Sequence, residues 1–190
     1  MTKSIILVGV GGQGTITTSS ILAKGLIEDG FDVKMSEIHG MSQRGGSVVT
    51  YVRYGDKVYS PIIDKGEAHF ILSFELLEAA RAAEWLRPDG TIITNTQEIN
   101  PMPVITGAMS YPEDLLEKLN ALGLKVDALD ALSLAMDAGS SKAVNLVLLG
   151  RLSNYFHDFT EEEWMTAIEQ SVPEKFLEMN KKAFHLGRIA

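Results

Sequence analysis

The feature that most constrains the fold of this chain is a glycine-rich turn directly after a short apolar segment. Residues 4–8 (SIILV) are rich in β-branched side chains that do not alternate with polar ones, which is typical of a strand covered on both faces in a parallel sheet. The turn occupies residues 9–14 (GVGGQG), and residues 15–29 then carry apolar side chains at helical spacing until Gly30. A strand, a tight turn and a helix in this order predict the opening of a Rossmann-like α/β fold.

The turn is the first candidate binding site, because it matches the pattern G-x-G-x-x-G between a strand and a helix. Glycines accept positive φ and let a phosphate approach the backbone N–H groups of a helix N-terminus. The acid that would bind a ribose hydroxyl at the end of the second strand is Glu37. The alternative is that the glycines only allow the helix to pack closely on the sheet. The candidate ligand-binding residues are Gly9, Gly11, Gly12, Gln13 and Gly14.

The second candidate site is a polar, glycine-bounded segment at residues 37–46 (EIHGMSQRGG), which we predict as a loop after a strand at residues 31–36. Loops at the strand ends of an α/β sheet are where ligands bind. Arg44 is the expected partner of a phosphate or carboxylate, and the alternative is a solvated loop in which Arg44 pairs with Glu37. The candidate residues are Glu37, Met41, Ser42, Gln43, Arg44, Gly45 and Gly46.

The remaining pattern predicts a single domain over residues 1–190 with three layers, α/β/α, around a mostly parallel sheet. Residues 47–54 and 57–63 are predicted to form an inserted antiparallel hairpin around Gly55-Asp56. Further strands are expected at 69–74, 90–96 and 124–129, and helices at 75–86 and 112–122.

Near the C-terminus, two patterns predict helices. Residues 142–156 are apolar on more than one face, so a helix there is either deeply buried or packed against a partner chain. Lys142 and Asn145 lie at its start and are placed to reach the ligand-binding edge of the sheet. Thr160 with Glu163 three residues later forms a capping box, which predicts the start of another helix.

Composition excludes several kinds of function. The 190 residues include no cysteine, which excludes a thiolate-held cluster, a thiol nucleophile and a disulfide within this chain. The net charge of −8 argues against a general nucleic-acid or anionic-membrane binder, and no apolar run approaches the ~20 residues of a membrane span. The histidines and serine pairs show neither metal-ligand spacing nor a neighbouring base. We expect a cytoplasmic protein with no metal site and no catalytic residue of its own.

Four segments, spread between residues 9 and 188, resemble the gamma subunit or domain of the 2-oxoacid:ferredoxin oxidoreductases, and the resemblance covers nearly the whole chain. They are GVGGQGTITTSSILAKG at 9–25, SEIHGMSQRGGSVVTYVRYG at 36–55, KVYSPII at 57–63 and VPEKFLEMNKKAFHLGR at 172–188. GGQG and GMSQRGG are distinctive of the wider family. Tyr111-Pro112 and the last segment are similar to its indolepyruvate branch, whose small subunit is called beta.

The resemblance implies a subunit of an enzyme that converts an aryl pyruvate such as indolepyruvate to aryl-acetyl-CoA, CO2 and reduced ferredoxin. Thiamine diphosphate with Mg, and the [4Fe–4S] clusters, would be carried by a larger alpha subunit in a two-alpha, two-beta assembly that passes electrons to ferredoxin. This chain would be inactive alone, would complete the active site and would help to bind the co-substrate coenzyme A. The absence of cysteine and of a G-D-G…N-N thiamine diphosphate motif agrees with this division.

Three alternatives remain open at this point. One is a gamma subunit for pyruvate, 2-oxoglutarate or branched-chain 2-oxoacids, since no residue of the sequence identifies the substrate. Another is a stand-alone Rossmann oxidoreductase that uses NAD or FAD, which Glu37 and the glycine turn would support. The third is a non-enzymatic nucleotide-binding module that uses the same turn.

Overall fold

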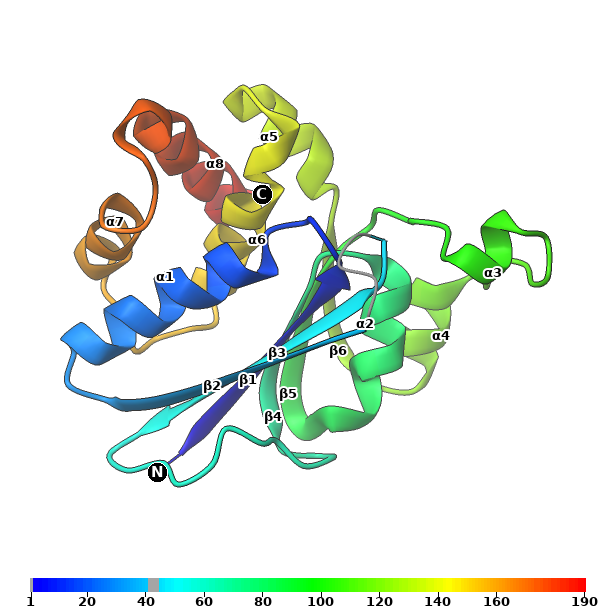
Figure 1. Ribbon diagram of the computed structural model, residues 1–190, viewed down its shortest axis with the longest axis horizontal. Coiled ribbons are helices and arrows are strands. Elements are labelled where there is room, and N and C mark those ends of the chain that lie inside the picture. The colour runs from blue at the N-terminus through cyan, green and yellow to red at the C-terminus, as the bar shows by residue number, and fades with distance from the viewer. Residues whose placement is uncertain (1, 41–44) are drawn as a thin grey trace.

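The computed structural model describes residues 2–40 and 45–190. The described residues form a six-stranded sheet with the order β2-β3-β1-β4-β5-β6, and helices cover both of its faces (Figure 1). The strands are β1 (Lys3–Val10), β2 (Asp32–His39), β3 (Ser47–Gly55), β4 (Ala68–Ser73), β5 (Leu86–Asn95) and β6 (Lys125–Leu129). Strands β1, β4, β5 and β6 pair in parallel, whereas β3 is antiparallel to both β1 and β2. The predicted three-layer α/β fold with a mostly parallel sheet is confirmed.

The helices form one layer on each face of the sheet, and one short helix projects from the body (Figure 1). One face is covered by α1 (Thr15–Glu28), α5 (Ala131–Ala138), α6 (Val144–Ser153), α7 (Glu161–Glu169) and α8 (Leu177–Ile189). The other face is covered by α2 (Leu76–Ala82) and α4 (Leu115–Ala121), and the projecting helix is α3 (Met102–Ile105). Single 3-10 turns occur at η1 (Ala83–Trp85), η2 (Ser141–Ala143) and η3 (Glu174–Phe176). In the described part of the chain, no helix is long and apolar enough to cross a membrane.

Helix α6 is the centre of the larger helical layer, and its burial explains its apolar sequence. All of its residues except Arg151 are buried, so the predicted helix within 142–156 is covered by this chain itself. It packs against α8, where Gly150 and Gly187 face backbone carbonyl groups of the opposite helix. The capping box of Thr160 and Glu163 is present at the start of α7, as predicted.

The predicted hairpin between residues 47–54 and 57–63 is wrong, because residues 57–63 form no strand. Strand β3 instead pairs with β2 on one side and β1 on the other. Side chains bind the backbone of the following segment: the Asp32 carboxylate accepts from Val58 N at 2.9 Å, and Arg53 Nη1 donates to the Ile62 carbonyl at 2.6 Å. Pro61 also has no N–H to donate to a ladder.

The predicted loop at 37–46 also begins too early, because β2 extends to His39. Glu37 pairs with Thr50, and His39 pairs with Val48. The backbone hydrogen bonds to β3 continue β2 through these polar residues. The prediction ended the strand too early because the local sequence does not show that a partner strand is present.

Candidate functional site

The glycine turn connects β1 to α1 at the carboxyl edge of the sheet, and its glycines are needed by the backbone. Gly12 and Gly14 have φ of 104° and 93°, and Gly14 is the N-cap residue of α1 with no side-chain cap. A Cβ atom at Gly9 would lie 2.9 Å from both Gln13 Oε1 and Phe74 Cβ. The turn therefore leaves the first N–H groups of α1 without a capping side chain, as an anion-binding helix N-terminus requires.

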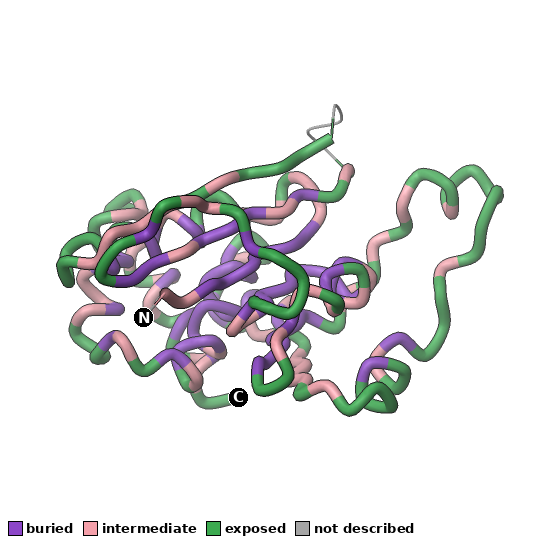
Figure 2. Tube along the Cα trace, turned by 90° about the horizontal axis from the view of Figure 1, so that it is seen from below, coloured by how far each residue is buried: buried purple, intermediate pink, exposed green. Residues whose placement is uncertain are grey.

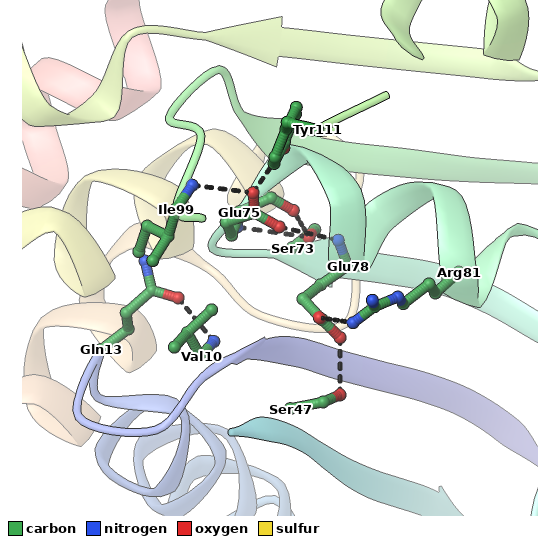
Figure 3. Close-up of polar contacts among 9 residues, drawn as sticks. All are labelled: Val10, Gln13, Ser47, Ser73, Glu75, Glu78, Arg81, Ile99 and Tyr111. Carbon is green, nitrogen blue, oxygen red and sulfur yellow. Dashed lines mark hydrogen bonds and ion pairs between the residues drawn. The ribbon is translucent and has the colours of Figure 1, made fainter. Parts of the chain in front are cut away.

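Gln13 holds the turn in shape. Its Oε1 accepts from Val10 N at 2.7 Å (Figure 3), and its Nε2 donates to the Phe74 carbonyl at 3.0 Å. The same carbonyl accepts from Asn95 Nδ2 at 3.3 Å, and Asn95 Oδ1 accepts from Ala131 N at 3.2 Å. These bonds join the turn, β4, β5 and α5, so both ends of the Gln13 amide serve the turn rather than face a ligand.

In the described part of the chain, two clefts flank the turn. The first, which we call the β2 cleft, has a volume of about 370 Å³; residues that line it include Gly11, Gly12, Gly14, Glu37 and His39. The second, the α6 cleft, has a volume of about 440 Å³; residues that line it include Gly12, Gln13, Gly14, Gln97, Ile99, Lys142 and Asn145. The structure thus brings Glu37 to one side of the turn, and the start of α6 to the other.

The β2 cleft does not have the arrangement of a dinucleotide site. Strand β3 lies between β1 and β2, so Glu37 is two strand spacings, about 10 Å, from β1. In the nucleotide-binding fold the ribose-binding acid follows the strand next to β1. Glu37 is instead 3.2 Å from His39 Nδ1, and its carboxylate is bound within its own strand. The geometry therefore favours the α6 cleft over the β2 cleft as the ligand site.

The α6 cleft contains a buried amide oxygen that lacks a partner. Asn145 is 6% exposed, and its Oδ1 has no hydrogen-bond partner within residues 2–40 and 45–190. A Cβ atom at Gly14 would lie 3.3 Å from Asn145 Nδ2, a tight contact, so glycine at this position lets the amide lie close to the turn. A buried polar atom without a partner costs about 1–3 kcal/mol. With the exposed Lys142 beside it, the cleft combines an unpaired amide oxygen, a positive charge and a helix N-terminus.

Two buried carboxylates at the start of α2, Glu75 and Glu78, bind groups in neighbouring segments. Glu78 accepts from Ser47 Oγ and from Arg81 Nη1, each at 2.6 Å (Figure 3). Glu75 Oε2 caps α2 by accepting from Glu78 N at 2.9 Å. The sequence pattern does not identify either residue as functional, because a glutamate at a helix start is usually solvated. The available signal was Glu78 three residues after Glu75, which is the spacing of a helix cap.

The second candidate segment meets the glycine turn at its end. Gly11 N donates to the Gly46 carbonyl at 2.8 Å, and Gly45 has a φ of 76°. Met41, Ser42, Gln43 and Arg44 lie outside the described residues, so their predicted binding roles stay predictions. Among the described residues, no group of three or more His, Cys, Asp and Glu side chains is arranged to hold a metal ion.

Comparison with known proteins identifies the family. The model of the pyruvate ferredoxin/flavodoxin oxidoreductase family matches residues 4–190. The chain belongs to this family. The indolepyruvate oxidoreductase subunit IorB of Thermococcus kodakarensis is 41% identical over 188 residues, which cover 97% of this chain and 93% of that protein. The gamma subunit common to the pyruvate and ketoisovalerate oxidoreductases of Pyrococcus abyssi is 27% identical, covering 92% of this chain and 89% of that protein.

A solved structure shares the fold. The 2-oxoglutarate:ferredoxin oxidoreductase of Magnetococcus marinus, with 2-oxoglutarate, coenzyme A and succinyl-CoA bound, matches with a TM-score of 0.75 and 18% identity. The match covers 99% of this chain but 30% of that chain. In that enzyme the fold of this family is one part of a longer polypeptide.

Proposed function

We propose that this chain is the small subunit of an indolepyruvate:ferredoxin oxidoreductase, which forms aryl-acetyl-CoA, CO2 and reduced ferredoxin. The observation that carries the proposal is 41% identity, over nearly the full length of both chains, to a subunit named for indolepyruvate. This chain is 27% identical to the subunit shared by the pyruvate and ketoisovalerate enzymes, so pyruvate and ketoisovalerate are the second candidates for the substrate. We expect the complex to work in the cytoplasm.

The proposal places the electron-transfer chemistry in a larger partner subunit. A [4Fe–4S] cluster needs thiolate ligands, and this chain has no cysteine, so its residues do not fit the cluster. Thiamine diphosphate with Mg is assigned to the same partner, and a two-alpha, two-beta assembly is the stoichiometry we expect. The small subunit would then close the active site, exclude water and help to bind coenzyme A.

The α6 cleft is the part of this chain that we assign to coenzyme A. The N-terminus of α1 carries about half a positive charge, which favours a phosphate at the glycine turn. Lys142 adds a full charge beside it, in a chain whose net charge is −8. The unpaired Asn145 Oδ1 would accept a hydrogen bond from an amide or an amino group of the same ligand. Arg44, which precedes the turn-contacting Gly46 by two residues in the sequence, would supply a second cation for phosphate.

The test uses the complex of this chain with its larger subunit, assayed with indolepyruvate, coenzyme A and ferredoxin. Lys142→Ala should raise the KM for coenzyme A about tenfold, because a charged hydrogen bond contributes about 1.5–3 kcal/mol, while the KM for indolepyruvate stays unchanged. Lys175→Ala, at another exposed lysine in η3, is the matched control. An unchanged KM for coenzyme A in both Lys142→Ala and Arg44→Ala would contradict the assignment of the α6 cleft to coenzyme A. Turnover of pyruvate in preference to indolepyruvate would contradict the proposal that indolepyruvate is the substrate.

Asn145→Leu separates a ligand-binding role from a structural one. The substitution removes a buried oxygen that has no partner, so we expect the isolated chain to become more stable by about 1 kcal/mol. The same variant should weaken coenzyme A binding in the complex. Loss of stability without an effect on the KM for coenzyme A would show that Asn145 serves the fold alone.

The stand-alone oxidoreductase and the nucleotide-binding module make a different prediction. Either would bind NAD, FAD or an adenine nucleotide without a partner, and the bound ligand would raise the melting temperature of the isolated chain. We expect no such rise with NAD(H) or FAD, because Glu37 is separated from β1 by an intervening strand.

A further inference from the structure

Residues 99–112 form an arm that extends away from the body of the molecule between β5 and α4 (Figures 1 and 2). The structure describes all of residues 96–114, and none of them is buried. Helix α3 lies in the outer part of the arm, where Met102, Ile105 and Met109 are 63%, 65% and 66% exposed. The arm therefore presents large apolar side chains to solvent without a core of its own.

One buried carboxylate holds both ends of the arm. Glu75, 1% exposed, accepts through Oε1 from Ile99 N at 3.0 Å and from the Tyr111 hydroxyl at 2.6 Å (Figure 3). Burial, with the hydrogen bond to Glu75, raises the pKa of Tyr111 above its usual value, so the phenol remains a donor. The arm is thus fixed at its base by a clamp rather than by packing.

Backbone hydrogen bonds within the arm keep its outer part folded. Ile105 N donates to the Pro101 carbonyl at 3.0 Å, and Met109 N donates to the Pro103 carbonyl at 3.0 Å. The prolines restrict the chain before any partner binds. An element that is already shaped loses little conformational entropy when it docks, which favours binding.

The composition of the arm is that of an interface rather than a solvated loop. Charged residues make up 22% of the chain, yet residues 99–112 include none. Methionine is enriched in interface cores, where charged residues are depleted. The base of the arm carries acids instead, with Glu98 before it and Glu113 and Asp114 after it, all exposed. An uncharged apolar tip on an acidic base is complementary to an apolar groove rimmed by lysine or arginine.

The position of the arm indicates which partner it meets. Gln97 and Ile99 line the α6 cleft, and the chain continues from them directly into the arm. A protein that closes this cleft must therefore lie beside the arm. A second copy of this chain is disfavoured, because symmetric docking of two arms would bring their acidic bases together between chains that each carry a net charge of −8.

We propose that the arm docks into an apolar, basic-rimmed groove of the larger, cofactor-bearing subunit and fixes that subunit over the α6 cleft. This inference rests on the function proposed above and adds to it the surface by which the small subunit engages its partner.

The test is the affinity of the full-length chain for the purified larger subunit. The double variant Ile105→Asp with Met109→Asp should bind at least tenfold more weakly, because it places two carboxylates in an apolar contact. Both side chains are about two-thirds exposed, so circular dichroism and the melting temperature should match those of the unmodified chain. Leu122→Asp, at a side chain 73% exposed beyond the end of α4, is the control and should bind normally.

The possible results separate the inference from the proposed function. Binding of the double variant within twofold of the unmodified chain would overturn the role of the arm and leave the proposed function intact. Failure of the unmodified chain itself to bind the larger subunit would overturn both. Dimerisation of the isolated chain in sedimentation, abolished by the double variant, would show that a second copy occupies the arm and would likewise overturn the inference.

Discussion

Replacing Gly150 with alanine tests how closely α6 and α8 approach. A Cβ atom at Gly150 would lie 1.9 Å from the Phe184 carbonyl oxygen, and one at Gly187 would lie 1.9 Å from the Val147 carbonyl oxygen. Each glycine therefore faces the backbone of the opposite helix. A backbone carbonyl cannot rotate away as a flexible side chain can, so the two helices themselves would have to separate.

The sign of the change in stability shows whether these glycines are required for the close approach of the two helices or could be replaced without a clash. Within a helix, alanine is favoured over glycine by about 1 kcal/mol, so without a clash Gly150→Ala would stabilise the protein. Carbon and oxygen atoms in close contact are about 3.3 Å apart, so the helices must move by about 1.4 Å. Overpacking of a buried contact costs about 1–3 kcal/mol, and more when only backbone can yield. We expect a net loss of about 2 kcal/mol, which lowers the melting temperature by roughly 4–8 °C.

The assay is thermal and urea unfolding of the isolated chain, followed by circular dichroism. Gly40→Ala is the control, because a Cβ atom there meets no described atom within 4 Å and its φ is not positive. The control should change the free energy of unfolding by less than about 0.5 kcal/mol. A Gly150→Ala variant as stable as the unmodified chain, or more stable, would refute the close approach of the two helices.

Two further predictions concern titration and the arm. Burial, with the adjacent Arg87 charge, lowers the pKa of His69, so the unfolded chain binds more protons and stability should fall as the pH drops below about 6.5. His69→Asn should reduce this fall in urea titrations across that range, and an unchanged pH dependence would exclude His69 as its source. Tyr111→Phe removes one donor from the Glu75 clamp, so amide hydrogen exchange in residues 99–111 should accelerate while that of β1 does not. Equal protection of the arm in both proteins would contradict the clamp.

Local signals predicted the first part of the chain well. The apolar run of β1, the glycine turn and the periodicity of α1 are each encoded within a few residues, and the predicted helix boundaries differ from the structure by one residue. The capping box at Thr160 is equally local, since its partner is three residues away. The sequence predicts Lys142 and Asn145 at the ligand-binding edge of the sheet, because they lie at the start of a helix in an α/β fold. In the structure, both residues line the α6 cleft.

Long-range pairing produced the errors. Residues 57–63 have a β-rich composition next to a Gly-Asp turn. Strand β3, however, is paired on one side with β1, which is far from it in the sequence, and on the other side with β2. No position remains beside β3 for another strand. The same pairing extends β2 through Glu37 and moves that acid away from β1.

The sequence by itself determined the fold class, the glycine turn and the family, because strand and helix periodicity, positive-φ glycines and family motifs are all properties of short segments. Only the tertiary structure decided which cleft contains an unpaired amide, which carboxylate clamps the arm, and where the helices meet through glycine. Each of these depends on burial and on contacts between residues distant in the chain. Burial sets the cost of an unpaired polar group: that cost makes the unpaired Asn145 Oδ1 informative about function, and it explains why the buried Glu75 carboxylate is paired with the arm.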